Sequence, residues 1–295
     1  MSGAIPESNG PDLHPRKPDF TLPPGACDCH CHVFGPQDKF PFSPARKYTP
    51  PDAPKEDLAR LHGAIGVERA VLVQASSQGN DNGSVIDTIA SNPDNYRGVG
   101  MIGDEAGEDE LAALHAQGMR GVRFTVLSHL GGAPDIGRFE HLLQRIAPFG
   151  WHADLHTDAA DLPPFAEASA RLGVPIVIDH MAKVRGMDGE DEESFNTLMD
   201  VVRGENCWVK LSCADRVSGT RFPYMDMAPV ARALIEAAPG RVIWGTDWPH
   251  VNARDKNPPN DGDLVDFLPL YLPEEDLQNK LLVQNPARLY GFPPI

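Results

Sequence analysis

The sequence predicts a single α/β domain folded as a (β/α)8 TIM barrel. Short apolar runs alternate with amphipathic stretches along the chain, and eight of these runs are strand candidates. The length of 295 residues suits a barrel of this kind, which forms one domain. A doubly wound open sheet is the alternative, but the first predicted strand is followed by Val33-Phe34-Gly35-Pro36 and not by a GxGxxG turn.

The predicted strands are apolar runs that end near polar side chains. They are Ala26–Phe34, Ala70–Gln74, Gly98–Ile102, Gly121–Leu127, His152–His156, Val174–Asp179, Trp208–Ser212 and Val242–Thr246. Between them, apolar residues recur at helical spacing, for example at Phe195, Leu198 and Val202. The expected helices are Lys55–Ile65, Ser84–Ser91, Asp109–Gln117, Phe139–Ile146, Phe165–Leu172, Phe195–Val202 and Met227–Ala237.

Three segments fall outside this alternation. Residues 1–24 are rich in proline, which opposes helix formation, so we expect an extended N-terminal arm before a barrel of residues 25–295. Two long segments, Phe40–Pro54 and Asn252–Asp263, follow the first and last predicted strands. We expect both loops at the C-terminal face of the barrel, where barrel enzymes carry their active sites.

Composition excludes several classes of protein. The chain has 26 Lys and Arg against 42 Asp and Glu, a net charge of −16, which argues against a nucleic-acid binder or a protein of anionic membrane surfaces. No apolar run approaches the ~18 residues of a transmembrane helix, and the first residues lack a secretory apolar region. Five cysteines then suit a reducing cytoplasm.

Two histidines lie near the end of the first predicted strand. Side chains alternate along a strand, so His30 and His32 share one face and the neighbouring cysteines share the other. Buried imidazoles need polar partners, which favours a functional pair in the barrel mouth over two ordinary strand residues. No second cluster completes a zinc finger, so we expect Cys27, Cys29 and Cys31 to pack between the barrel and its helices.

Three further groups end other predicted strands. His156 ends the fifth, His180 follows the sixth, and Asp247 follows the eighth. Because the carboxyl ends of barrel strands meet at one face, we expect these groups to converge with His30 and His32. The same five residues are the expected ligands if a metal is bound.

Two chemistries remain open for this cluster. In one, a single Zn²⁺ lowers the pKa of a bound water so that hydroxide attacks near neutral pH. In the other, no metal is present, Asp247 is the general base for a water, and the imidazoles polarise a carbonyl. The expected cofactor is therefore one Zn²⁺ or none.

Cations near the strand ends predict an anionic small molecule as the partner. Arg123 lies within the fourth predicted strand, where an arginine is costly to bury without an anion. Lys183 and Arg216 follow the sixth and seventh strands. Guanidinium groups bind carboxylates through paired hydrogen bonds. Tyr48 and Ser76 add neutral donors.

At these residues the chain resembles the amidohydrolase superfamily, in the branch of 2-pyrone-4,6-dicarboxylate lactonases. The resemblance runs from the first strand to the C-terminus. The matching stretches are PPGACDCHCHVFGPQDKFPFSPARKYTP, VLVQASSQGNDN, GMRGVRF, PIVIDHM, RVIWGTDWPH and LLVQNPARLYGF.

The resemblance implies hydrolysis of an anionic lactone in the breakdown of aromatic compounds. It implies that Asp247 activates the water and that His30, His32 and His180 polarise the lactone carbonyl. The residues that it implies for substrate binding are Tyr48, Ser76, Arg123 and Arg216. The dicarboxylate lactonases of this branch work without a metal, and Arg123 stands where many relatives have a metal-bridging lysine.

Three positions depart from that branch. His156 stands in place of a tyrosine, His129 in place of an arginine after the fourth strand, and Lys183 in place of an arginine after the sixth. Arginine and lysine are not equivalent at a carboxylate, so these residues suggest a differently shaped anion, with one carboxylate or a sulfonate. His156 also completes a better metal shell than tyrosine would.

The alternatives are therefore a sulfomuconolactone or muconolactone hydrolase with one zinc, and a sugar-acid lactone isomerase or decarboxylase on the same fold. A non-catalytic binder of a small acid is disfavoured, because binding alone does not require a base beside several imidazoles. The sequence does not indicate an oligomeric state.

Overall fold

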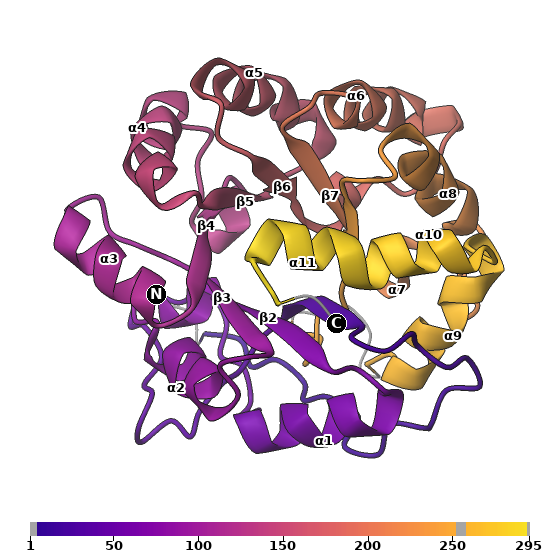
Figure 1. Cartoon of the computed structure of the whole chain (residues 1–295), viewed down its shortest axis with the longest axis horizontal. Helices are drawn as coiled ribbons and strands as arrows, with labels where there is room; N and C mark the ends of the chain where they lie inside the picture. The colour runs from indigo at the N-terminus through magenta and orange to yellow at the C-terminus, as the bar shows by residue number, and fades with distance from the viewer. Residues whose placement is uncertain (1–4, 252–257, 294–295) are drawn as a thin grey trace.

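The computed structural model describes residues 5–251 and 258–293. Eight parallel strands form one sheet in the order β1 to β8, surrounded by helices, which confirms the predicted (β/α)8 barrel (Figure 1). The strands are β1 Cys27–Cys31, β2 Arg69–Val73, β3 Tyr96–Gly100, β4 Met119–Thr125, β5 His152–His156, β6 Ile176–Ile178, β7 Cys207–Leu211 and β8 Val242–Trp244.

The barrel closes where the chain after β8 meets β1. The backbone N–H of Asp247 donates to the carbonyl of His30 at 2.7 Å, and the N–H of His32 donates to the carbonyl of Trp248 at 2.8 Å. These two bonds place the end of the eighth strand directly beside the histidines of the first.

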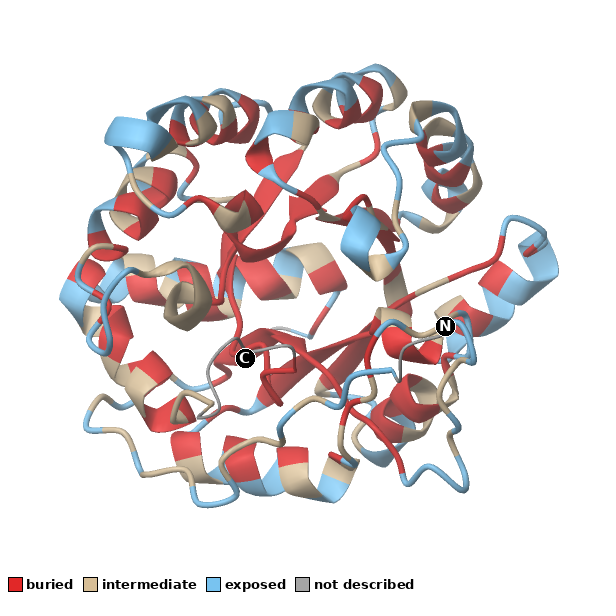
Figure 2. Ribbon diagram, turned by 180° about the vertical axis from the view of Figure 1, so that it is seen from behind, coloured by how far each residue is buried: buried red, intermediate tan, exposed pale blue. Residues whose placement is uncertain are grey.

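Helices pack around the sheet with their apolar faces inward, and Figure 2 shows buried residues on the inner side of the ring and exposed ones outside. In α4, for example, Phe139, Leu143 and Ile146 are buried at helical spacing. The helices are α1 Lys55–Ile65, α2 Gly83–Ser91, α3 Glu108–Ala116, α4 Ile136–Ile146, α5 Leu162–Leu172, α6 Glu192–Val202, α7 Ala214–Val217, α8 Ala228–Ala237, α9 Asp261–Tyr271, α10 Glu275–Asn279 and α11 Asn285–Tyr290.

The core has an inner and an outer part. Val71 and Val73 of β2 belong to a small cluster inside the barrel, whereas Ala70 and Leu72 of the same strand belong to the large cluster between barrel and helices. Tyr290 and Phe292 join the inner cluster. The guanidinium groups of Arg69 and Arg97 lie over the Phe292 ring, so this cluster fills the end of the barrel where the strands begin.

One expectation about β1 is wrong. Cys27 and Cys29 belong to the inner cluster, and only Cys31 belongs to the outer one. The reason is a register shift in the pairing of β1 with β2, between Asp28 and Cys31. This bulge breaks the alternation of the strand, so that Cys29 and His30 both face inward.

The chain after β8 also differs from expectation. Residues 252–257 of the predicted loop Asn252–Asp263 lie outside the described residues, but α9 already begins at Asp261. The side chain of Asn260 accepts the N–H of Gly262 at 3.1 Å and so caps this helix. The polar run that predicted a loop is therefore in part a helix start, and α10 and α11 follow it.

The N-terminal segment and the loop after β1 lie against the barrel. Residues 5–24 contain no helix. Glu7 pairs with Thr49, and Arg16 forms ion pairs with Asp263 and Asp266 of α9. Within the described ranges, no helix is both long and apolar enough to cross a membrane.

Candidate active site

The site is centred on the carboxylate of Asp247. Its Oδ1 atom lies 3.2 Å from Nε2 of His32, 3.4 Å from Nε2 of His30 and 3.8 Å from Nε2 of His180. Its Oδ2 atom accepts a hydrogen bond from the Cys213 thiol at 3.1 Å and pairs with the guanidinium of Arg216. The structure thus brings four of the expected groups around one carboxylate.

The backbone around these residues adopts a conformation that L-residues rarely take. Asp247 has a φ of 64° and Cys213 a φ of 61°. From His180 to Lys183, four consecutive residues have φ between 49° and 60°, so the chain after β6 makes a short left-handed turn. Left-handed residues cost about 1–2 kcal/mol each. Such strain is typical of functional sites.

Burial keeps the imidazoles of His30 and His180 neutral. It lowers the pKa of His30 to about 3, against the opposing effect of Asp179. Burial also lowers the pKa of His180 well below its usual value, although Asp247 opposes the shift. Neutral imidazoles offer one N–H donor and one lone pair each, which suits either a polarised carbonyl or a metal.

Asp247 stays ionised. Burial raises the pKa of this carboxyl, but Arg216 and the imidazoles outweigh that effect and hold the pKa well below its usual value. At neutral pH the group is therefore a carboxylate, and its proton affinity depends on how closely Arg216 is held.

Beneath the imidazoles lies a buried network of charges. Lys210 of β7 contacts Asp154, lies 3.1 Å from Oδ1 of Asp179 and lies 3.1 Å from Nδ1 of His30. Two guanidinium nitrogens of Arg123 each lie 3.0 Å from Oδ2 of Asp179. Arg123 therefore has the buried anion that the sequence required, but it is a carboxylate of the protein itself.

A cavity of about 1040 Å³ opens above this network. His129, His156, His180, Lys183 and Arg216 line it, so these expected residues share one space. Lys183 also lies 3.4 Å from Asp158, at the rim.

The family model of the amidohydrolases matches residues 27–292. The chain belongs to the amidohydrolase family. A 2-pyrone-4,6-dicarboxylate hydrolase of Comamonas testosteroni is 42% identical, covering 94% of this chain and 93% of the relative. A 4-sulfomuconolactone hydrolase of Hydrogenophaga intermedia is 39% identical, covering 97% and 95%.

Solved structures agree with this family membership. A Pseudomonas putida protein, described as a candidate 2-pyrone-4,6-dicarboxylic acid hydrolase, superposes on this amidohydrolase with a TM-score of 0.81 at 30% identity. The superposition covers 93% of this chain and 100% of the other.

Three of the predicted binding residues, Tyr48, Ser76 and Arg123, are not among those that line the large cavity of this amidohydrolase. Ser76 lines a separate space of about 110 Å³ next to Arg123. Tyr48 is buried, and burial raises the pKa of its hydroxyl while Arg123 and Arg216 act in the opposite direction. Tyr48 therefore lies near both arginines, whereas Ser76 is not among the residues that line the larger space.

His156 takes a different place from the other predicted metal ligands. Its Nδ1 atom lies 3.2 Å from the Arg123 guanidinium, and its ring centroid is 5.4 Å from that of His180. Among the described residues, it joins no group of three ligand atoms within 4.8 Å, whereas His30, His32 and Asp247 form one. The geometry of this amidohydrolase therefore favours His156 as a cavity residue.

A metal ion fits the donor atoms of the remaining set. Nδ1 of His32 donates to the carbonyl of Val73 at 2.7 Å, which turns the Nε2 lone pair toward Asp247. Nδ1 of His30 lies 3.3 Å from Asp179, and its buried Nε2 has no hydrogen-bond partner. One divalent ion such as Zn²⁺ could therefore be held by Nε2 of His30, Nε2 of His32 and Oδ1 of Asp247.

Sequence reasoning missed several residues of this amidohydrolase site. Lys210 and Asp179 join the buried charge network, and Cys213 and Ser212 contact His180, with Ser212 Oγ 2.8 Å from its Nδ1. The signal for Lys210 was a lysine within the apolar run Cys207–Leu211, where an unpaired charge would be costly. No comparable signal marks Ser212 or Cys213, whose side chains are small and common in cores.

Proposed function

We propose that this chain is a hydrolase that opens an anionic lactone, 2-pyrone-4,6-dicarboxylate or a close relative, in the breakdown of aromatic compounds. The observation that carries this proposal is the ionised carboxylate of Asp247, which faces the imidazoles of His30, His32 and His180 beside a large cavity with cationic walls. The two relatives named above, a dicarboxylate hydrolase and a sulfomuconolactone hydrolase, support the substrate class.

The acid groups of the substrate are recognised by cations of the cavity. Arg216 has a quarter of its side chain exposed and pairs with Asp247, and Lys183 lies at the rim. A substrate carboxylate or sulfonate that takes up the Arg216 guanidinium leaves Asp247 with a weaker counter-charge. Binding of the correct anion therefore raises the proton affinity of the base.

Asp247 then acts as the general base. It takes a proton from a water molecule as the water oxygen attacks the carbonyl carbon of the lactone. Neutral His30 or His180 donates an N–H to the carbonyl oxygen, which becomes negative in the tetrahedral intermediate. When the intermediate collapses, the ring C–O bond breaks and Asp247 returns its proton to the ring oxygen.

The same residues serve either of the two chemistries left open by the sequence. A divalent ion held by His30, His32 and Asp247 would supply a bound water of lowered pKa when present. Two partners of His30 Nδ1 match the two cases: Lys210 donates to Nδ1 when Nε2 carries the proton, and Asp179 accepts the Nδ1 proton when Nε2 offers its lone pair. All five cysteines are free and buried, which supports the cytoplasm as the location of the enzyme.

Ultraviolet spectroscopy of lactone ring opening tests the proposal. We expect the purified protein to turn over at least one of 2-pyrone-4,6-dicarboxylate, 4-sulfomuconolactone and muconolactone, with a product that has gained one water. Asp247→Asn should lower turnover by at least about a thousandfold, because the base is lost. Asp200→Asn, on the exposed face of α6, is the matched control.

Near-normal turnover by folded Asp247→Asn would exclude the assigned base. Failure of the folded wild-type protein on all three lactones would overturn the substrate class. A product of unchanged mass would indicate an isomerase, and release of carbon dioxide a decarboxylase.

A further inference from the structure

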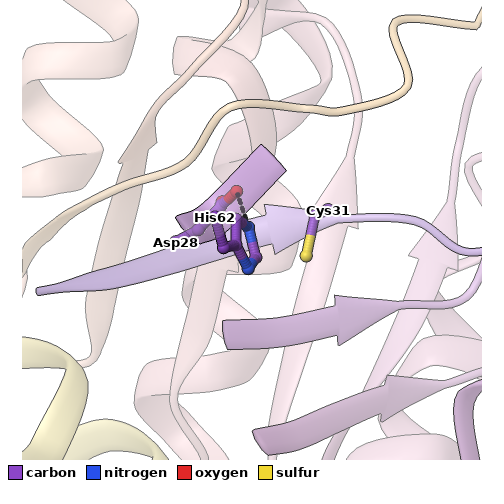
Figure 3. A group of neighbouring side chains, drawn as sticks. All are labelled: Asp28, Cys31 and His62. Atoms are coloured by element: carbon purple, nitrogen blue, oxygen red, sulfur yellow. Dashed lines mark hydrogen bonds and ion pairs between the residues drawn. The ribbon is translucent and has the colours of Figure 1, made fainter. Parts of the chain in front are cut away.

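Outside the barrel, the carboxylate of Asp28 lies between β1, α1 and the chain after β8. Figure 3 shows Asp28 and Cys31 on β1 with His62 of α1, and the dashed line joins Asp28 to His62. Asp28 and Cys31 are fully buried, and His62 is almost fully buried. This cluster belongs to none of the steps described above.

The oxygens of Asp28 accept four hydrogen bonds. Oδ1 accepts the backbone N–H of His30 and that of Thr246, both at 3.0 Å. Oδ2 accepts the Thr246 hydroxyl at 2.6 Å and lies 3.2 Å from Nε2 of His62. One carboxylate thus joins the backbone just before Asp247 to the backbone of His30.

These four contacts exclude a metal at this cluster. An ionised carboxylate has about four acceptor positions, and all of them are used. The Cys31 thiol also has a partner, the carbonyl of Val71 at 3.6 Å. The role of the cluster is therefore in positioning.

The bulge of β1 explains why such a link is needed. A bulge leaves one residue out of the regular hydrogen-bond ladder and changes the direction in which the neighbouring side chains point. Here it turns His30 inward, and Asp28 accepts the N–H of His30 itself. On the other strand, a Cβ atom at Gly245 would lie 2.6 Å from the His30 nitrogen, so only glycine lets the two segments approach this closely.

We propose that Asp28, together with His62 and Thr246, is a positioning group that sets the separation of His30 and Asp247. The distance between His30 Nε2 and Asp247 Oδ1 is 3.4 Å. The importance of this distance for catalysis rests on the proposed function, whereas the structural link through Asp28 does not depend on it. Among the described residues, the hydrogen-bond partners of Asp28 do not line the large cavity, so Asp28 acts through the segments that carry the imidazole and the carboxylate.

Thr246→Val tests this link with little change of shape, because it removes one hydroxyl, which donates to Asp28 and accepts the backbone N–H of Trp248 at 3.0 Å. Asp28→Asn leaves the bond to Trp248 in place and so separates the two contacts. We expect kcat to fall about 10- to 100-fold, as for other outer-sphere groups, with KM changed by less than about threefold. Thr246→Ser restores a hydroxyl and should recover most of the wild-type kcat. Asp28→Asn is a second variant and should lower kcat in the same way.

The matched control is Ser169→Ala in α5. It removes the buried hydrogen bond from the Ser169 hydroxyl to the carbonyl of Val174 and does not affect β1 or β8. It should lower the melting temperature to a similar degree and leave kcat unchanged. If Asp28 had only a structural role, all variants would lose stability and keep the wild-type kcat. Wild-type kcat in both Thr246→Val and Asp28→Asn would overturn the proposal.

Crystal structures of the variants give a readout that needs no substrate. We expect the His30 Nε2 to Asp247 Oδ1 distance in Thr246→Val to change by more than about 0.5 Å, the tolerance of a catalytic arrangement. An unchanged distance in both variants would refute the link. A changed distance in a protein that opens no lactone would refute the proposed function and leave the link standing.

Discussion

Arg216 decides how strong a base Asp247 is. Its guanidinium contacts Oδ2 of Asp247, while Oδ1 faces the imidazoles. A buried carboxyl without such a partner would have a raised pKa, whereas this one is held well below its usual value. In the proposed mechanism, the two oxygens of this side chain therefore have separate tasks, one toward substrate binding and one toward proton transfer.

Arg216→Gln should move the acidic limb of the kcat/KM profile to higher pH. The active form of Asp247 is the carboxylate, so activity is lost as pH falls through its pKa, and removal of Arg216 raises that pKa. KM should rise as well, because an anion-binding group is lost. Arg221→Gln, in the same cavity but outside this ion pair, serves as the control and should leave the limb in place. If the limb of Arg216→Gln were not shifted, Arg216 would not set the pKa of the base.

Lys210 is a fully buried charge beneath the site, as are its partners Asp154 and Asp179. Its ammonium group contacts Asp154 and Asp179, and these contacts raise its pKa against the opposing effect of burial. Lys210→Met should lower the free energy of unfolding by about 3–5 kcal/mol, because two buried carboxylates lose their shared counter-charge. Urea denaturation measures this loss. The surface variant Arg203→Ala should change stability by less than about 0.5 kcal/mol, and an equally small loss in Lys210→Met would argue against the network.

At the scale of elements, alternation of apolar runs and helical faces was enough to predict the eight strands and most of the helices. It failed where the backbone departs from regular geometry. The bulge of β1 reversed the expected places of Cys27 and Cys29, since alternation counts residues and a bulge adds one. The convergence of His30, His32, His180 and Asp247 was predictable because barrel strands all end at one face. Lys210 and Asp179 were missed because alternation along one strand does not show which buried charges pair across the barrel.

The left-handed turn from His180 to Lys183 was equally invisible, since none of its four residues is glycine. Ala182→Gly should stabilise the protein by up to about 1 kcal/mol, because glycine adopts a positive φ without the steric cost. Ala168→Gly, in the right-handed helix α5, is the matched control and should destabilise by about 1 kcal/mol. Thermal or urea unfolding compares the two, and a loss of stability in both would show that the turn is not strained at Ala182.

At the scale of the whole molecule, a net charge of −16 surrounds a cavity with cationic residues. The overall field repels an anionic lactone at a distance, whereas Arg216 and Lys183 attract it at contact range. Salt screens the interactions of exposed charges that are more than about 8–10 Å apart. It screens the partly buried ion pairs of the site much less.

We therefore expect kcat/KM for a dianionic lactone to rise about twofold between low salt and physiological ionic strength, because repulsion at long range weakens first. A neutral lactone, used as the control, should show no such rise. A steady fall of kcat/KM with salt would mean that the cationic cavity dominates the approach of the substrate.

The N-terminal arm gives a practical consequence of the fold. Glu7 pairs with Thr49 beside Tyr48, and Arg16 binds Asn260 and Asp263, which line the cavity. The arm is thus packed against residues that line the large cavity, whereas Phe292 lies at the opposite, closed end of the barrel. An affinity tag or fluorescent fusion partner attached ahead of the arm would therefore be joined to a segment that packs beside the proposed substrate cavity. Immobilisation or labelling through the C-terminal end would instead avoid that segment.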